Sequence, residues 1–382
     1  MFFNGLRMKI LIAAGLFYPS KLGGPANTLY WFAKALISKN TEVSVVTSKN
    51  HIDENSIEFD KWIKVDGIRV RYCSTYTKLH LRILFNSIRE LLKCDVVILS
   101  SFFYIPNFPI ALCSVLLNKK VIWSPRGELF ESAINRSKAK LFYVRIIKFF
   151  FAKKAIFHST STDECCRIKK YLGADSKIVI IPNYIELPYK QNRVEGKEYL
   201  LYLGRIAPIK ALDKLLLGLA KSDSFIQSNF ILLIAGGVEN QFGDYYEKIQ
   251  LIIQNKELLK NKIIFLGNVE GAEKYKLYAN AFFTLLVSDS ENFGNVVVES
   301  LSQGTPVIAS KGTPWQKLED KKAGFWINNN VEDIANCIDE VLKIENKEYQ
   351  QIRNNAYNYG LEFDVHTNID KWINVIKNHV TI

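Results

Sequence analysis

Residues 288–310 read SDSENFGNVVVESLSQGTPVIAS, and the order of residue types predicts a strand, a helix and a second strand. The first strand is expected at Phe282 to Ser288, followed by a polar loop that Gly294 closes. The helix is expected at residues 295–303, and a Gly-Thr-Pro turn leads into the second strand at Val307 to Ser310. This stretch is therefore predicted to be a βαβ unit of a parallel sheet.

The loop of this unit has the features of an anion site flanked by two carboxylates. In open parallel sheets, a loop past the carboxyl end of a strand faces the ligand crevice, and the amides at a helix start suit a phosphate. Here those amides belong to Phe293, Gly294 and Asn295. A phosphate needs no carboxylate, so we expect Glu291 and Glu299 to accept hydrogen bonds from sugar hydroxyls. Phosphate and sugar together indicate a nucleotide sugar.

The spacing of these residues resembles a known signature. Glu291, seven residues, Glu299 and then Ser-Leu-x-x-Gly-x-Pro-Val-Ile-Ala-Ser is similar to the motif of retaining family 4 glycosyltransferases, which have the GT-B fold. The resemblance covers nearly the whole chain, most strongly residues 155–330. Residues 311–315 (KGTPW) and 324–327 (GFWI) resemble a subset of the family found in surface-polysaccharide pathways.

The resemblance implies an α/β protein of two doubly wound, parallel-sheet, Rossmann-like domains that face each other across a cleft. We place the acceptor-binding domain at residues 1–190 and the nucleotide-sugar-binding domain at residues 191–365. A C-terminal helix within residues 366–382 is expected, by resemblance, to pack back on the first domain. The sequence leaves open whether Met1 or Met8 is the native start.

Length and composition agree with this class. A chain of 382 residues fits two domains, and 48% apolar with 23% charged residues is typical of a soluble globular protein. No apolar run reaches the length of a membrane span. The formal charge of +12 implies an anionic partner, and nucleic acid is the least favoured one because no compact basic tract is present. Six cysteines without a paired framework favour a reducing cytoplasm.

The second domain carries the predicted catalytic residues. Arg205 and Lys210 lie five residues apart between a strand end and a helix start, so both can reach one diphosphate. They resemble the family's Gly-Arg…Lys pair, with an alanine in place of the common glycine after the lysine. By resemblance, Glu291 completes the catalytic set by orienting the donor sugar, Glu299 holds the ribose and the backbone of Val269 faces the nucleobase. We expect neither a metal nor another cofactor.

The first domain carries candidates for both substrates. The Gly23-Gly24 pair precedes a helix and lets backbone amides approach a phosphate or sugar, so Gly24 is assigned to the donor. Arg126 and Glu128 follow a predicted strand and are assigned to the acceptor, with a surface ion pair as the alternative. Many family members have a His at or near the position of Arg126, which leaves its role beyond binding anions or hydroxyls open. No Gly-x-Gly-x-x-Gly is present, which disfavours a nicotinamide enzyme.

A basic and apolar helix is predicted at residues 138–155 (KAKLFYVRIIKFFFAKKA). Its composition resembles that of an amphipathic helix lying on a membrane surface. A core helix with a solvated basic rim explains the same pattern, and the sequence leaves both alternatives open. His158, beyond this helix, is expected to be a structural residue at a strand end.

The function predicted from these features is retaining transfer of a sugar from a nucleoside diphosphate sugar, with UDP favoured, to a glycan acceptor. We expect the acceptor to be lipid-linked and to belong to O-antigen, capsule or exopolysaccharide assembly. The expected location is the cytoplasm, peripherally on the anionic inner face of the cell membrane. The sequence names neither the base, the sugar, the acceptor nor the oligomeric state.

Two further classes stay open. A non-catalytic nucleotide-sugar-binding or membrane-associated adaptor would keep the same fold and lose the transfer. A metal-dependent GT-A transferase would use Asp289-Ser290-Glu291 as its metal pair, but Gly294, the helix and Glu299 fit that arrangement badly.

Overall fold

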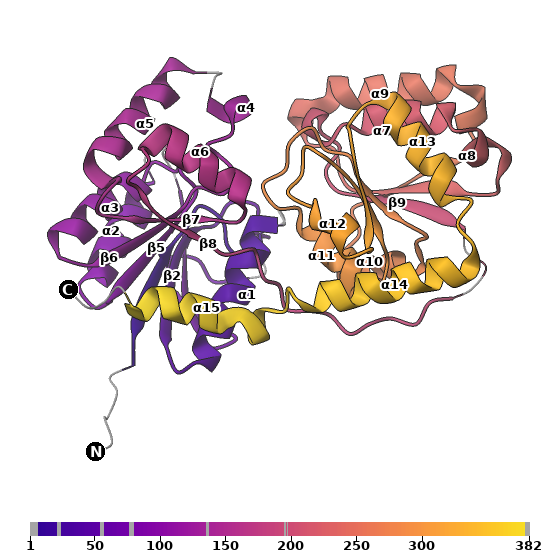
Figure 1. Ribbon diagram of the computed structural model, residues 1–382. Coiled ribbons are helices and arrows are strands. Elements are labelled where there is room, and N and C mark those ends of the chain that lie inside the picture. Colours follow the sequence, from indigo (N-terminus) through magenta and orange to yellow (C-terminus); the bar gives the residue numbers. More distant parts are fainter. Residues whose placement is uncertain are drawn as a thin grey trace. The chain divides into compact units, whose positions relative to one another are not determined.

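The computed structural model describes residues 7–20, 24–53, 57–75, 80–134, 137–194, 196 and 198–378. The chain divides into two compact units (Figure 1). Unit 1 comprises Met1–Glu186 and Val365–Ile382, and unit 2 comprises Leu187–Asp364. These divisions lie within a few residues of the sequence boundaries at 190 and 365.

Unit 1 is built on an eight-stranded sheet in the order β3-β4-β2-β1-β5-β6-β7-β8. Its strands are β1 (Lys9–Ala13), β2 (Glu42–Ser48), β3 (Trp62–Val65), β4 (Ile68–Cys73), β5 (Val96–Ser100), β6 (Lys120–Ser124), β7 (Ile156–Ser159) and β8 (Lys177–Ile180). Every neighbouring pair is parallel except β3 and β4. The central strands are short buried apolar runs, as expected of a sheet covered on both faces.

The antiparallel edge strand β3 corrects the expectation of a purely parallel sheet. β3 joins β4 through Asp66 and Gly67, whose φ angles are +47° and +83°. Two consecutive positive φ angles are typical of the tight turn that connects a hairpin, and Asp-Gly favours this turn. The dipeptide was therefore a readable signal that the sequence analysis missed.

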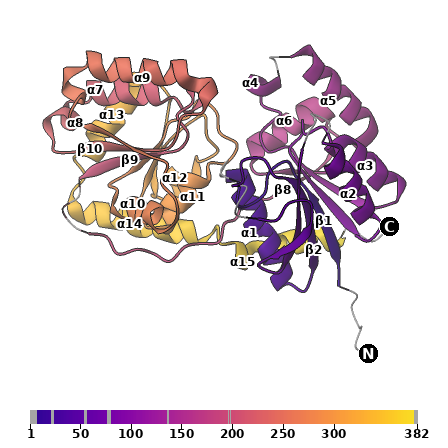
Figure 2. The ribbon, with the colours of Figure 1, turned by 180° about the vertical axis from the view of Figure 1, so that it is seen from behind.

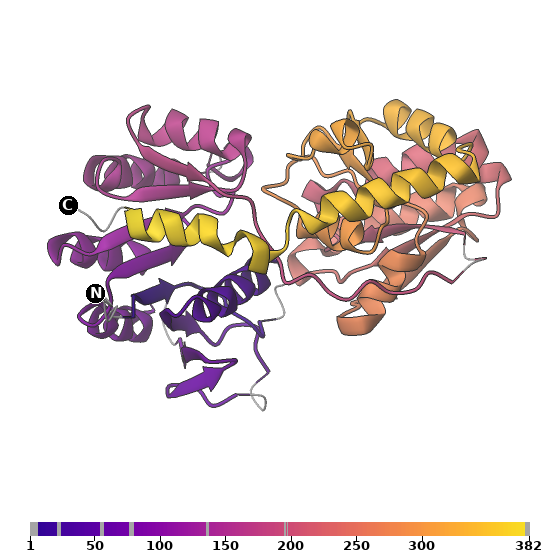
Figure 3. The same ribbon diagram turned by 60° about the horizontal axis from the view of Figure 1, so that its bottom comes forward.

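Helices cover both faces of the unit 1 sheet. They are α1 (Gly24–Ser38), α2 (Leu81–Leu91), α3 (Asn107–Leu116), α4 (Glu131–Ile134), α5 (Lys138–Phe151), α6 (Thr162–Leu172) and α15 (Val365–Asn378). The C-terminal helix α15 packs beside α1 on one face (Figure 3). The ring of Trp372 on α15 lies 4.6 Å from the rings of both Phe32 on α1 and His158 on β7. A segment more than 170 residues away in sequence thus completes the core of unit 1.

Unit 2 is built on a six-stranded, fully parallel sheet in the order β11-β10-β9-β12-β13-β14. Its strands are β9 (Tyr199–Leu203), β10 (Ile231–Ala235), β11 (Ile263–Gly267), β12 (Thr284–Leu286), β13 (Val307–Ser310) and β14 (Gly324–Ile327). Its α-helices are α7 (Leu212–Lys221), α8 (Asp223–Gln227), α9 (Gly243–Asn255), α10 (Gly271–Asn280), α11 (Asn295–Ser302), α12 (Lys317–Asp320), α13 (Val331–Val341) and α14 (Asn346–Leu361). Figure 2 shows α7, α9 and α13 on one side of the sheet and α10, α11 and α14 on the other.

The expectation of two doubly wound α/β sheets is confirmed. The differences are local: β12 is shorter than the strand expected at Phe282 to Ser288, and the sequence analysis assigned no elements to residues 328–362, where α13 and α14 lie. In the described part of the chain, no helix has both the length and the apolar character needed to cross a membrane.

The packing of α15 makes Trp372 a test of unit 1. We expect Trp372→Ala to lower the free energy of unfolding of this unit by about 3–5 kcal/mol, because it removes a buried ring between α1 and β7. Urea unfolding followed by circular dichroism measures the change. The control Asn374→Ala alters an exposed position of the same helix and should change stability by less than about 0.5 kcal/mol. Equal losses in both variants would show that the ring does not anchor the helix.

Candidate functional site

The carboxyl ends of β9, β10 and β11 are brought together by closely approaching backbones. The amide of Gly236, after β10, donates to the carbonyl of Gly267 at the end of β11 at 2.7 Å. A Cβ added to Gly236 would overlap the carbonyl oxygen of Gly204, which follows β9. Only glycine therefore fits at position 236, and the loop that begins at Gly204 is held beside the two neighbouring strand ends.

Arg205 lies in this loop and is held from two sides. Its Nη1 donates to Glu239 Oε1 at 2.7 Å, and its carbonyl accepts from the Tyr202 hydroxyl at 2.8 Å. About half of the Arg205 side chain is exposed. The structure thus adds Glu239, which the sequence analysis did not single out, as the carboxylate that positions this cation.

Lys210 and Glu291 form a direct ion pair, and each side chain is 17% exposed. Lys210 ends a 3₁₀ turn, η1 (Pro208–Lys210), and Ala211 follows in the left-handed region with φ +52° and ψ +38°. In the family that the sequence resembles, a glycine is common at this position, and the alanine adopts a conformation that favours glycine. A residue with a Cβ is about 1–2 kcal/mol less stable in this conformation than in a right-handed one. Its presence here is consistent with a backbone that the surrounding site constrains.

The loop that carries Glu291 is fixed by its own backbone. The Glu291 amide donates to the carbonyl of Gly312 at 2.9 Å, and the Asp289 amide donates to that of Ile209 at 2.8 Å. A Cβ on Gly312 would overlap the carbonyl oxygens of Ser288 and Asp289, so Gly312 is required for this contact. Both hydrogen bonds tie the loop to neighbours that the sequence analysis did not connect with it.

Gly294 begins the helix start that the sequence analysis assigned to a phosphate. It has φ +82°, and a Cβ there would lie 2.8 Å from Leu286 Cδ2 and 3.2 Å from Glu291 Cγ. The helix α11 starts at the next residue, Asn295, and the first amides of a helix have no acceptor within it. The geometry therefore has the elements of an anion site beside Glu291.

The Phe293 side chain has a structural role. Its ring is buried and packs 5.1 Å from the ring of Trp315 and 5.9 Å from that of Phe363. Trp315 Nε1 also donates to the Phe293 carbonyl. Only the backbone amide of Phe293 stays a candidate for the donor.

Glu299 is 5% exposed and is held by two residues of α10. Lys274 Nζ donates to its Oε1 at 2.9 Å, and the Tyr278 hydroxyl donates to its Oε2 at 3.0 Å. Burial is the largest single influence and lowers the pKa of Lys274, but the charge of Glu299, the Tyr275 hydroxyl and the hydrogen bonds to both together raise it more, so the net shift is upward. A buried carboxylate with a buried cation is stable only as a pair, so Lys274 belongs to the site although the sequence analysis missed it. Its spacing from Tyr278, four residues on one helix, was the available signal.

Val269 follows β11 and is half-buried in an apolar cluster that also contains Tyr275 and Val296. It packs against the same apolar cluster as residues of α10 and α11, the two helices that contribute the Glu299 network. This placement agrees with the expectation that Val269 and Glu299 serve adjacent parts of one nucleotide.

In unit 1, the predicted acceptor residues point to different partners. Arg126 has φ +57°, and its Nη1 donates to Asn183 Oδ1 at 3.1 Å. Glu128 accepts from the Ser101 hydroxyl at 2.7 Å, from the Phe103 amide at 2.8 Å and from the Phe102 amide. No salt bridge joins Arg126 to Glu128, both of which are described, so the alternative of an ion pair between them is wrong. Glu128 instead fixes the loop that follows β5.

His158 lies in a buried polar cluster beside Arg126. Its Nδ1 is 2.8 Å from the Ser124 hydroxyl, and its Nε2 is 2.8 Å from the carbonyl of Ile181. Burial, and to a lesser extent the Arg126 charge, lower the pKa of His158 to about 3. The expectation of a structural histidine is confirmed. The other first-domain candidate, Gly24, is the exposed first residue of α1, whereas Gly23 lies outside the described residues.

Within the described ranges, no group of three or more His, Cys, Asp or Glu side chains is arranged to hold a metal ion. The polar groups of the site are three cation–carboxylate pairs, one of them buried, and a helix start. Such a set can bind an anion and hydroxyl groups at once, which is the chemistry of a phosphorylated sugar.

Comparison with known proteins agrees with this chemistry. Residues 184–359, slightly less than half of the chain, match the family described as Glycosyl transferases group 1. The chain is 27% identical over 176 residues to alpha-1,3/1,6-mannosyltransferase ALG2 of Dictyostelium discoideum, covering 42% of each protein. It is 26% identical over 182 residues to the O-antigen chain mannosyltransferase RfbU of Salmonella typhimurium, covering 45% of this chain and 49% of RfbU. The chain spans less than half of the length of the first curated relatives it matches.

The fold has close structural likenesses along its whole length. The crystal structure of Anabaena HepE in complex with UDP and glucose has a TM-score of 0.77 and 17% identity, and the match covers 97% of this chain and 100% of that one. This likeness shows the GT-B fold of two Rossmann-like, parallel-sheet units.

The buried state of His158 predicts a pH dependence of stability. An unfolded histidine has a pKa near 6.5, whereas that of folded His158 is about 3. Between these values the unfolded chain binds a proton that the folded chain does not, so stability is complete above pH 6.5 and is lost as the pH falls. At pH 5.0 the loss relative to pH 7.5 should be about 2 kcal/mol. His158→Gln should lack this part of the dependence in urea unfolding at both pH values, and an identical loss in the variant would contradict the assignment.

Proposed function

We propose that the protein is a retaining, metal-independent glycosyltransferase that moves a sugar from a nucleoside diphosphate sugar to a glycan acceptor. The observation that carries this proposal is the Lys210–Glu291 pair beside the start of α11 at Gly294. Glu299, within the same helix, is held by Lys274 of α10. The family match spans all of these residues. The complex of HepE with UDP and glucose, a protein of the same fold, supports UDP as the nucleotide.

The proposed reaction breaks the bond between the anomeric carbon and the diphosphate oxygen and forms a bond from an acceptor hydroxyl to the same carbon. Negative charge develops on the departing diphosphate, and Arg205, Lys210 and the first amides of α11 stabilise it. Fixed cations and amides of this kind typically contribute several kcal/mol to catalysis. The acceptor proton passes to the diphosphate oxygen that leaves, so no protein base is needed. Retention of configuration rests on the resemblance of residues 291–310 to the retaining family.

Each carboxylate has a separate part in this proposal. Glu291 accepts a hydrogen bond from a donor-sugar hydroxyl while the diphosphate takes over its partner Lys210. Glu299 accepts from the ribose hydroxyls and stays paired with Lys274. In a glycosidase the two carboxylates stand across one scissile bond, whereas here each is assigned to a different sugar ring.

Lys210→Ala and Glu299→Gln test the donor site. UDP or a UDP-sugar, with EDTA present, should raise the melting temperature of the native protein, because a ligand that binds only the folded state stabilises it. Both variants should lose most of this rise. Lys210→Ala should in addition lower the rate of donor consumption by about 10²–10³-fold, the usual loss for one charge-stabilising group. A panel of UDP, GDP, ADP and their sugars identifies the base.

The matched control is Lys221→Ala, which removes a lysine from the far end of α7, where it pairs with Glu332. It should behave like the native protein. No nucleotide-induced rise in the native protein, or an equal rise in Lys210→Ala, would contradict the proposed donor site. Binding without turnover would favour the adaptor instead, and loss of activity in EDTA would overturn metal independence.

We further propose that the acceptor is a lipid-linked glycan of surface-polysaccharide assembly, reached at an anionic membrane. RfbU, a relative of this chain, is named an O-antigen chain mannosyltransferase, which supports the surface-polysaccharide part of this proposal. The helix α5 buries Val144, Ile147 and Phe151 in the core of unit 1. Its outer side exposes Phe142 and Phe149, which are 64% and 83% exposed. The helix therefore combines both sequence alternatives, a core contact on one side and an aromatic, basic surface on the other.

The basic residues of α5 and its C-terminal end give the membrane proposal a test. Replacing Arg145, Lys148, Lys153 and Lys154 by alanine should weaken binding to phosphatidylglycerol vesicles at least tenfold, because each basic residue near an anionic surface contributes about 1 kcal/mol. Vesicle sedimentation measures the change. The control replaces four exposed lysines of unit 2 (Lys256, Lys317, Lys343, Lys347) and removes the same charge. Unchanged binding in the α5 variant, or an equal loss in the control, would show that α5 is only a core helix.

A further inference from the structure

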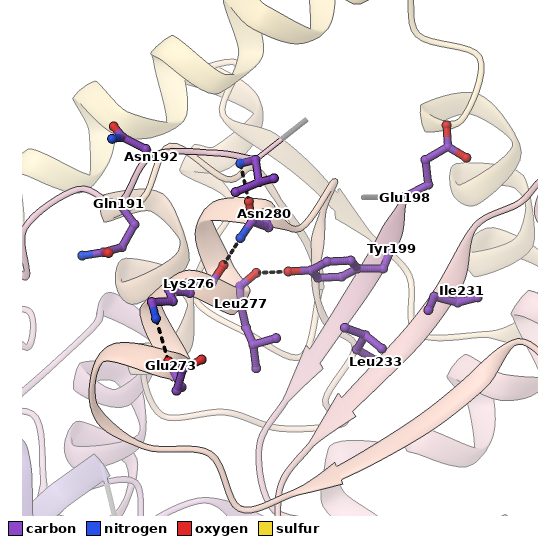
Figure 4. A pocket seen from close by; sticks show the side chains of 11 residues that line it. Gln191, Asn192, Glu198, Tyr199, Ile231, Leu233, Glu273, Lys276, Leu277 and Asn280 are labelled. Atoms are coloured by element: carbon purple, nitrogen blue, oxygen red, sulfur yellow. Dashed lines mark hydrogen bonds and ion pairs between the residues drawn. The ribbon is translucent and has the colours of Figure 1, made fainter. Parts of the chain in front are cut away.

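Unit 2 contains a cavity of about 590 Å³ away from the residues discussed above (Figure 4). The strands β9 and β10 contribute Tyr199, Ile231 and Leu233 to one side of it. The other side is formed by α10 and by the segment 191–194, which follows the start of unit 2. A volume of this size is within the range of pockets that hold small-molecule ligands.

The position of the cavity separates it from the proposed donor site. Its strand residues Tyr199 and Ile231 begin β9 and β10, whereas Gly204 and Gly236 follow the carboxyl ends of the same strands. The strands are parallel, so the cavity and the donor site lie at opposite edges of one sheet. Nucleotides in open α/β sheets bind at the carboxyl edge, and this cavity is therefore a different kind of site.

The wall formed by residues 191–194 is anchored by two buried amide side chains. The backbone N–H of Gln191 donates to Gln303 Oε1 at 2.8 Å, and the backbone N–H of Val194 donates to Asn280 Oδ1 at 2.7 Å. Asn280 Nδ2 in turn donates to the Lys276 carbonyl of α10 at 2.9 Å. Gln303 and Asn280 are both buried. The wall is thus held at both of its ends, and the cavity is preformed in the folded unit.

One face of α10 lines the cavity, and another face serves Glu299. Glu273, Lys276, Leu277 and Asn280 recur at the spacing of one helix face and line the cavity. Lys274 and Tyr278, the partners of Glu299, are each adjacent to one of them in sequence and face the other way. The helix therefore forms part of both sites.

The lining chemistry favours a neutral, hydroxyl-rich ligand. Its floor is apolar, with Ile231, Leu233 and Leu277, and its rim carries amide and carboxylate groups. The described rim has two carboxylates, Glu198 and Glu273, and one lysine, Lys276, which is already paired with Glu273 at 2.7 Å. This balance disfavours a phosphate. A sugar ring presents an apolar C–H face and hydroxyl groups, which match such a floor and rim.

We propose that this cavity is a second carbohydrate-binding site, which takes a neutral glycan segment of one or two sugar rings. The choice of carbohydrate among neutral ligands rests on the proposed function, because a protein that extends a glycan meets such segments. The site holds the segment away from the reacting centre, at the opposite edge of the unit 2 sheet.

Two probes are suitable: the neutral disaccharide maltose and the charged monosaccharide glucose 1-phosphate. Saturation-transfer NMR should show maltose contacts in the native protein and in Ile264→Trp, which places the same ring on the neighbouring strand β11 outside the cavity. Ile231→Trp places a large ring over the apolar part of the cavity lining, where the sugar ring would lie, and should abolish them. A double variant, Asn192→Ala with Glu198→Ala, alters two exposed rim residues and should weaken maltose binding at least fivefold.

The same samples separate this proposal from the proposed function. The UDP-induced rise in melting temperature should be unchanged in Ile231→Trp, which also shows that the variant is folded. No maltose contact in the native protein, or an equal contact in Ile231→Trp, would overturn the second site. Preferential binding of glucose 1-phosphate would overturn the neutral class of ligand. A missing UDP effect with intact maltose binding would reject the donor site and leave this one standing.

Discussion

The candidate site depends on backbone contacts at the carboxyl edge of the unit 2 sheet that leave no room for a side chain. A Cβ at Gly236 would overlap the carbonyl of Gly204, and one at Gly312 would overlap the carbonyls of Ser288 and Asp289. These contacts bring the loops after β9, β10, β12 and β13 within hydrogen-bonding reach of one another. Two cation–carboxylate pairs of the site, Arg205 with Glu239 and Lys210 with Glu291, lie on those loops. Their geometry is therefore set by close-packed main chain, which tolerates little displacement.

The helix α10 imposes a second constraint, because it carries the only polar groups seen to hold Glu299 among the described residues. Burying one charge costs several kcal/mol unless a partner and hydrogen bonds compensate for it, and Lys274 and Tyr278 supply both. The same helix lines the second cavity with its other face. A change in the position of α10 would therefore act directly on Glu299. The cavity and Glu299 are connected through this one helix, without a series of intervening contacts.

Features of the fold that depend on residues close together in sequence could be predicted, whereas contacts between residues far apart in sequence could not. The βαβ unit at residues 288–310 and the position of Gly294 at its helix start were predictable because periodicity and turn chemistry are local. The pairing of Lys210 with Glu291, 81 residues apart, is a property of the folded sheet, although both residues were named. Glu239 and Lys274 were missed because a charged residue on a surface loop or helix looks ordinary until its partner is known. The β3–β4 hairpin was missed although Asp66-Gly67 signals it, because β3 is a four-residue edge strand without a buried apolar run.

The pairing of Arg205 and Lys210 with carboxylates has a consequence for how the proposed donor would be recognised. Lys210 lies against Glu291, and Arg205 lies against Glu239, so an incoming diphosphate competes with a carboxylate for each cation. A diphosphate carries more negative charge than one carboxylate and also gains the amides at the start of α11, which favours the exchange. The exchange releases Glu291, whose oxygen atoms then need a new donor, and a hydroxyl of the attached sugar can provide it. A free sugar would have to break the ion pair without a replacement partner for Lys210. A free diphosphate would pair with Lys210 but would leave Glu291 without a replacement partner. In this arrangement the two parts of the donor are bound best together, and the ion pair itself discriminates against each part alone.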